Sequence, residues 1–311
     1  MPDHAASRTN YLRPEILSKI GGLELRARSV VEGIVSGMHR SPYQGYSVEF
    51  AQHREYVPGD DLRHLDWRVY GKSDRFYVKQ YEEETNLRAY LMLDCSASMR
   101  YPEHERSSGR MTKFEYAATL AASLAYLLVH QQDAVGLMLF DNQLRANLPA
   151  MSNYAHLHSI LGRLELARLD SPTDATAAFA QLGTQLHRRS LAILISDLLA
   201  DGDDVIRGIE RLGQGNHEVI VMHVLDEDER TFPFVDQTLF EGLEAPEVQL
   251  TADPQSLRTA YLEALEAFVE RIRSTCVNQR IDYLGVSTND SLDVVIRGYL
   301  AARLRRIKSR V

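Results

Sequence analysis

Five oxygen-bearing side chains stand where predicted secondary-structure elements begin or end. Asp94, Ser96 and Ser98 occupy alternate positions of "DCSAS", directly after the apolar run "AYLML". Asp197 follows the apolar run "LAILIS", and Thr173 precedes a predicted helix in "LDSPTDATAAF". Carboxylate and hydroxyl oxygens, without His or Cys, suit a hard cation such as Mg²⁺ in octahedral geometry. These residues therefore form a predicted magnesium site.

The charge of this donor set predicts how the metal would be used. Only Asp94 and Asp197 would be ionised, so a bound divalent cation keeps much of its positive charge. Mg²⁺ also demands six oxygen ligands in near-ideal geometry, and the set leaves a coordination position open. We expect a carboxylate from a partner protein to complete the shell.

Simpler interpretations of the same residues stay open at this stage. Asp94 can be an ordinary polar strand end and Ser98 a turn residue. Thr173 or Asp174 can cap the helix that follows, since both types are favoured at a helix N-cap. Asp201 is an alternative to Asp197 as the acidic ligand.

The segment from residue 89 onward alternates between apolar strands and helical patterns. Strands are predicted at 89–95, 134–140, 191–197, 217–225 and 281–287, with an edge strand within 141–149. Helices are predicted near 114–128, 154–164, 175–186, 205–212 and 254–277, with a last one through residue 304. Residues 226–253 interrupt this rhythm and are expected to leave the sheet. The pattern predicts a doubly wound α/β fold with a mostly parallel sheet and helices on both faces.

Residues 1–88 differ from the rest and are predicted to form a smaller β-rich N-terminal unit. A short helix is expected at 14–20, and alternating apolar residues around Val48 and Phe76 predict short strands. Trp67 is expected to be half-buried, or to belong to a partner surface in "PGDDLRHLDW". The predicted domains are therefore 1–88 and 89–311.

Two motifs resemble known families. "DCSAS", the loop threonine and the strand-end aspartate resemble the metal-ion-dependent adhesion site of von Willebrand factor type A domains, and the element order from residue 89 matches that fold. "REYVPGDDLRHLDW" is similar to the segment that precedes such a domain in the bacterial domain of unknown function 58 family. The resemblance implies metal ligands at Asp94, Ser96, Ser98, Thr173 and Asp197. It differs from many type A domains by the insertion "RYPEHERSSGRM" before the first helix of the fold.

Composition narrows the possible functions. The net charge of -8 disfavours unspecific nucleic-acid binding, which needs a positive surface. The two cysteines, Cys95 and Cys276, are far apart and predict no disulfide framework. No apolar window is long enough for a membrane span, so a cytoplasmic location is expected. His156 and His158 form no metal motif and are expected to be solvated.

The function expected from these observations is a non-catalytic, Mg²⁺-dependent protein-interaction module. The family resemblance implies a MoxR-type AAA+ ATPase as partner and a role in assembling or activating other protein complexes. A metal-dependent hydrolase acting on phosphate esters is the alternative. A phosphatase with an aspartate nucleophile usually has a second aspartate two residues on, where this chain has Ser96.

Overall fold

A computed structural model describes residues 14–38, 53–55, 76–79, 87–102, 110–171, 175–186, 190–215, 217–245 and 247–308. The chain divides into two compact units, one formed by residues 1–36 with 87–311 and the other by residues 37–86. In the smaller unit, β1 (His53–Glu55) pairs antiparallel with β2 (Tyr77–Lys79). Trp67 and the rest of "PGDDLRHLDW" lie outside the described residues.

The larger unit begins earlier than the boundary predicted near residue 88. Its first helix, α2 (Pro14–Met38), is far longer than the short helix expected at 14–20. Four apolar side chains at helical spacing are buried in the core of the α/β unit, namely Leu23, Ala27, Val31 and Ile34. The helix therefore belongs with the α/β unit because its apolar stripe needs that core to be covered.

Six strands form the main sheet. They are β3 (Arg88–Asp94), β4 (Ala134–Phe140), β5 (Leu144–Met151), β6 (Leu191–Ser196), β7 (Glu218–Leu225) and β10 (Asp282–Ser287), in the order β10-β7-β6-β3-β4-β5. Neighbours are parallel except β5, which is antiparallel to β4 at the edge. Burial explains the difference: β6 is buried throughout, whereas β5 alternates between half-buried and exposed residues. The predicted fold class is confirmed.

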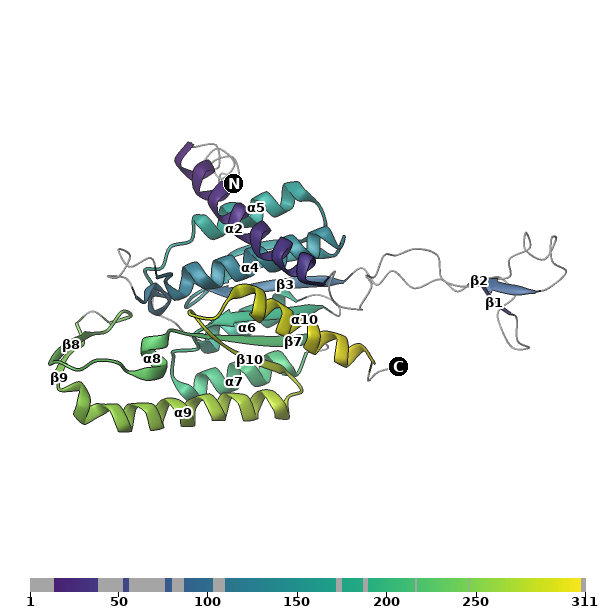
Figure 1. Ribbon diagram of the computed structural model, residues 1–311. Helices are drawn as coiled ribbons and strands as arrows, with labels where there is room; N and C mark the ends of the chain where they lie inside the picture. Colours follow the sequence, from purple (N-terminus) through teal and green to yellow (C-terminus); the bar gives the residue numbers. More distant parts are fainter. Residues whose placement is uncertain are drawn as a thin grey trace, which may run out of the picture. The chain divides into compact units, whose positions relative to one another are not determined.

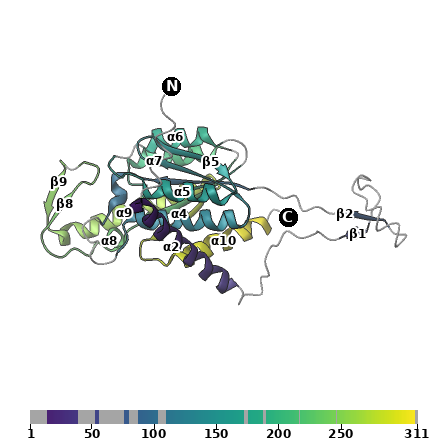
Figure 2. The same ribbon diagram turned by 90° about the horizontal axis from the view of Figure 1, so that it is seen from above.

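Helices cover both faces of this sheet (Figures 1 and 2). One face carries α2 with α4 (Lys113–His130), α5 (Tyr154–Glu165) and α10 (Leu292–Lys308). The other carries α6 (Ala175–Gln185), α7 (Gly202–Gly213) and α9 (Pro254–Asn278). The free cysteines are buried in different layers, Cys95 in the first and Cys276 in the second. As predicted, they form no disulfide.

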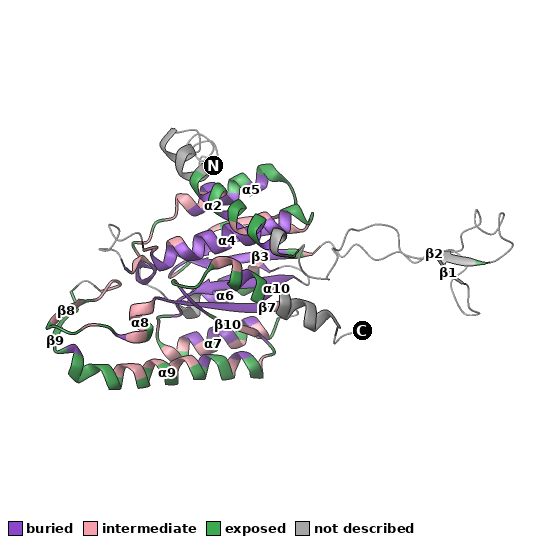
Figure 3. Ribbon diagram, in the orientation of Figure 1, coloured by how far each residue is buried: buried purple, intermediate pink, exposed green. Residues whose placement is uncertain are grey.

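Residues 226–253 leave the sheet, as the sequence predicts. They form α8 (Glu227–Thr231) and a hairpin of β8 (Thr238–Glu241) with β9 (Gln249–Ala252). Phe232 packs against Phe234, Phe240 and Tyr261, which joins α8 to the hairpin and to α9. Most of the hairpin and of α9 is exposed, in contrast to the buried central strands (Figure 3).

The two histidines of helix α5, His156 and His158, differ in their exposure. His158 is exposed, but the prediction of a solvated His156 is wrong, because this residue is 7% exposed. Its Nε2 donates a hydrogen bond of 2.9 Å to the backbone oxygen of Val135 on β4.

Within the described part of the chain, none of the helices is both long and apolar enough to span a membrane.

Candidate metal centre

The predicted site lies at the carboxyl edge of β3 and β6. In the sheet β3 lies between β4, its successor in the chain, and β6, to which the chain returns after β5. The loops after β3 and β6 therefore lead in opposite directions, and ligands bind at such a switch point in open α/β sheets. Asp94 ends β3 and Asp197 follows β6, so the topology places both carboxylates at this switch point.

The loop after β3 turns its polar groups inward. Asp94, Ser96 and Ser98 are only 1%, 0% and 6% exposed. The backbone N–H of Ser96 donates to Asp94 Oδ1 at 2.9 Å, and the Ser96 and Ser98 hydroxyls lie 3.0 Å apart. The loop continues into the short 3-10 helix η3 (Ala97–Arg100). Alternate serines thus present both hydroxyls to the same interior as the aspartate.

The loop after β6 is joined to this group through Ser196. Its hydroxyl donates to Asp94 Oδ2 at 2.5 Å and accepts from the backbone N–H of Leu198 at 2.9 Å. Asp197 is fully buried, and the Ser98 hydroxyl is close enough to stabilise its ionised form. Leu198 has a φ of 54°, in the left-handed region that non-glycine residues rarely adopt.

The structure brings together four of the predicted ligands, while Thr173 and the alternative Asp174 lie outside the described residues. The backbone oxygen of Ser171, two positions before Thr173, accepts a hydrogen bond of 2.8 Å from the Ala97 N–H. Asp201 is exposed and caps α7 by accepting from the Asp203 and Asp204 N–H groups. Asp197, and not Asp201, is therefore the carboxylate beside Asp94.

The two aspartates have opposite electrostatic environments. Burial, and then the charge of Asp197, raise the pKa of Asp94 above its ordinary value. Burial alone would also raise the pKa of Asp197, but the ammonium of Lys113 outweighs it and holds that pKa below its ordinary value. The ammonium of Lys113 therefore stabilises the negative charge of Asp197, whereas the negative charge of Asp94 is disfavoured. A cation bound beside Asp94 would stabilise this second charge.

Lys113 and Glu229 are site residues that the sequence interpretation missed. Lys113 Nζ lies 2.7 Å from Asp197 Oδ2 and 2.6 Å from Glu229 Oε1. Burial opposes the charge of this lysine, but the two carboxylates raise its pKa above the ordinary value. The sequence signal was a lysine at the first position of α4, between Thr112 and Glu115, which form the capping box of this helix.

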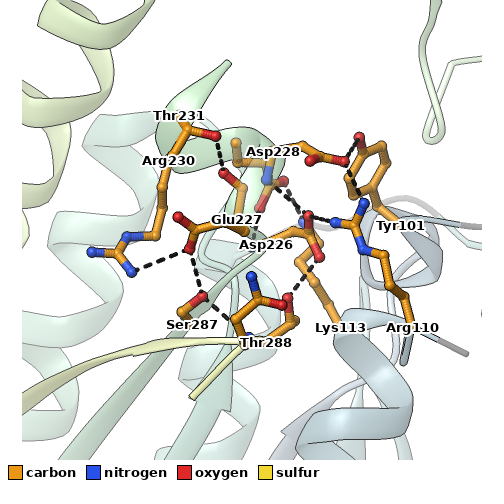
Figure 4. A network of polar contacts seen from close by, with 12 residues as sticks. Tyr101, Arg110, Lys113, Asp226, Glu227, Asp228, Arg230, Thr231, Ser287 and Thr288 are labelled. Carbon is orange, nitrogen blue, oxygen red and sulfur yellow. Dashed lines mark hydrogen bonds and ion pairs between the residues drawn. The ribbon is translucent and has the colours of Figure 1, made fainter. Parts of the chain in front are cut away.

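A polar network extends from Lys113 to the end of β7 (Figure 4). Glu229 Oε2 accepts from the Asp226 N–H at 2.7 Å, completing the capping box of α8. The guanidinium of Arg110 spans Asp226 and Asp228 at 2.6 and 3.0 Å. The loops after β6 and β7 are thus linked through charged groups, and the Ser196 hydroxyl joins the end of β3 to the loop after β6.

His223 on β7 contacts the backbone of the loop that contains Asp197. Its Nε2 lies 2.9 Å from the backbone oxygen of Asp197, which can only accept, so this nitrogen carries the proton. Nδ1 must then accept from the Tyr283 hydroxyl, also at 2.9 Å. Burial lowers the pKa of His223 to about 4, so the ring is neutral at neutral pH.

The donor chemistry of the described residues fits Mg²⁺. Two carboxylates and two hydroxyls are buried near one another at this edge of the sheet, and all are oxygen ligands of the type that hard cations prefer. Among the residues that the structure describes, no three His, Cys, Asp or Glu side chains form a metal-holding group, so an all-acidic cage is absent there. The candidate centre therefore depends on serine hydroxyls as well as on carboxylates.

Two curated proteins are similar to this chain over almost its full length. An uncharacterized protein of Mycobacterium tuberculosis is 25% identical over 296 residues, covering 94% of this chain and 91% of that protein. An uncharacterized protein of Mycobacterium bovis matches equally, with 25% identity over the same coverage. Both relatives extend over nearly the whole chain, including both units.

Solved structures show similarity at low identity. The BatB protein of Bacteroides thetaiotaomicron is 14% identical, covering 70% of this chain and 99% of that chain, with a TM-score of 0.45. The VWA domain of SpRpn10 is 14% identical, covering 68% of this chain and 93% of that chain, with a TM-score of 0.37. The family described as "Protein of unknown function DUF58" matches residues 52–270, and the chain belongs to this family.

Proposed function

We propose that this protein is a non-catalytic docking module in which Mg²⁺ is held by Asp94, Ser96, Ser98, Thr173 and Asp197. The observation that supports this most strongly is the joint burial of Asp94, Ser96, Ser98 and Asp197 at the switch point of the sheet. When bound, the metal supplies a Lewis-acidic position that an incoming carboxylate can fill.

The protein's own residues have separate roles in this proposal. Asp94 is oriented by the Ser96 N–H and the Ser196 hydroxyl, one on each oxygen. Asp197 is oriented by the Leu199 N–H, which donates to Oδ1 at 3.1 Å. Because both carboxylates are held before any ligand arrives, little ordering is left to oppose binding.

The partner in this proposal is a protein that presents an exposed Asp or Glu, and the family resemblance favours a MoxR-type AAA+ ATPase. Binding between the two purified proteins can be measured by surface plasmon resonance. Because such an ATPase itself uses Mg²⁺ with nucleotide, the decisive comparison is between variants of this chain at one Mg²⁺ concentration.

Asp94→Asn is the test variant, since it keeps the shape of the side chain and removes its charge. The matched control is Asp201→Asn, which makes the same change at an exposed helix cap, where Asn caps as well as Asp. We expect Asp94→Asn to abolish ATPase binding and Asp201→Asn to preserve it. Equal binding by both variants would refute metal-dependent docking through Asp94.

A further inference from the structure

Lys113 occupies a position that general rules for lysine disfavour. It is the first residue of α4, where the helix dipole opposes a positive charge, and it is 0% exposed. Lysine is almost never fully buried unless it is paired. Lys113 is therefore expected to be paired, and its ammonium bonds to the carboxylates of Asp197 and Glu229.

The charges around this ammonium do not balance. Asp94, Asp197 and Glu229 contribute three negative charges to the interior of this edge, and Lys113 contributes one positive charge, which is bonded to Asp197 and Glu229. With every carboxylate ionised the group carries a formal charge of 1 − 3 = −2, which is the amount that one divalent cation neutralises. Lys113 therefore compensates only part of the charge.

We propose that Lys113 is a built-in counter-cation that neutralises Asp197 in the metal-free protein and gives up this carboxylate to the metal. The inference rests on the proposed metal centre. It follows from the bond between Lys113 Nζ and Asp197 Oδ2, because that oxygen belongs to a predicted ligand. A cation that uses Asp197 must compete with the ammonium for the same carboxylate.

Glu229 makes this exchange feasible. Its Oε1 already accepts from Lys113 at 2.6 Å, so the ammonium keeps a carboxylate partner after losing Asp197. An unpaired buried ammonium would be costly, and the second partner avoids this cost. The same glutamate accepts from the Asp226 N–H through Oε2, so the state of Lys113 is connected to the cap of α8.

The competition can be tested by measuring Mg²⁺ affinity calorimetrically for the wild type and for Lys113→Met. The variant removes the competing charge and retains an unbranched side chain for the buried site. We expect Mg²⁺ to bind more tightly by on the order of tenfold or more, because a unit charge within a few ångströms of a cation is strongly felt in a buried site. Thermal unfolding in EDTA should show lower stability for the variant, which saturating Mg²⁺ restores.

Lys113→Gln is the second variant, since its amide can still donate to Asp197 if Lys113→Met fails to fold. Glu229→Gln completes a double-mutant cycle. With Glu229 neutral, Lys113 relies on Asp197 alone, so Lys113→Met should tighten Mg²⁺ binding by a larger factor in that background than in the wild type.

Unchanged or weaker Mg²⁺ binding by both Lys113 variants would overturn the inference, while the Asp94→Asn comparison would still test the metal centre. Absence of Mg²⁺ binding in the wild type and in both Lys113 variants is a different result. It would refute the proposed metal centre itself, and the counter-cation role with it.

Discussion

The two aspartates of the candidate centre should respond in opposite ways to the same substitution in metal-free protein. Asp94→Asn removes a buried charge that no cation among the described residues contacts, so it should raise the free energy of unfolding. Asp197→Asn removes a partner of the buried Lys113 ammonium, so it should lower that free energy. Neither substitution changes the size of the side chain appreciably.

The magnitudes follow from the environments of the two carboxylates. Burial and the charge of Asp197 raise the pKa of Asp94 from 3.8 to about 7. At about 1.4 kcal/mol per pKa unit, its ionised form costs the native state up to about 4 kcal/mol. The Asn amide must still be hydrogen-bonded, so we expect a net gain of about 1–2 kcal/mol. Breaking a buried ion pair costs about 3–5 kcal/mol. In Asp197→Asn the ammonium of Lys113 keeps Glu229 as a partner, so we expect the free energy of unfolding to fall by about 3 kcal/mol, the lower end of this range.

The assay is thermal unfolding followed by circular dichroism at neutral pH in EDTA. For a domain of this size 1 kcal/mol shifts Tm by about 2–4 °C, so the Tm values of the two variants should differ by about 8–20 °C. Asp201→Asn, the exposed helix cap, serves as the control with little expected change. Similar destabilisation by Asp94→Asn and Asp197→Asn would show that the described charge arrangement is wrong.

Three further predictions concern other residues. Ser196→Ala should weaken Mg²⁺ binding in calorimetry by on the order of tenfold, because its hydroxyl orients Asp94, and an unchanged affinity would remove Ser196 from the site. Burial lowers the pKa of His156, so the unfolded chain binds more protons and stability should fall as the pH drops below about 6.5. His156→Gln should reduce this pH dependence in denaturant titrations at pH 5 and 8, and an identical pH dependence in both proteins would contradict the assignment. Gly208→Ala should cost about 1–3 kcal/mol in the same titrations, because a Cβ there would collide with the Phe179 ring, and wild-type stability would contradict the close packing.

The strands and most helices of the α/β unit could be predicted because their signals are local. Uninterrupted apolar runs such as that of β6 indicate strands that are buried on both faces. The capping box at Thr112 and Glu115 fixes where α4 starts. Once these elements are ordered, topology alone places Asp94 and Asp197 at one edge of the sheet.

What the sequence interpretation missed depends on contacts between distant segments. The partners of Lys113 are 84 and 116 residues away, so its burial has no local signal beyond an unfavourable position in the helix. His156 is buried because the Val135 carbonyl on β4 accepts its N–H. The full length of helix α2 could have been predicted, since the apolar residues Leu23, Ala27, Val31 and Ile34 follow helical spacing. The turn residues around them favoured a β-rich interpretation instead.

The most direct test of the central claim is a calorimetric titration of the purified protein with Mg²⁺, with Asp94→Asn and Asp201→Asn measured beside it. The account predicts one bound Mg²⁺ per chain in the wild type and in Asp201→Asn, and no measurable binding in Asp94→Asn. Equal heats of binding in wild type and Asp94→Asn, or no binding in the wild type, would contradict a metal centre at the switch point.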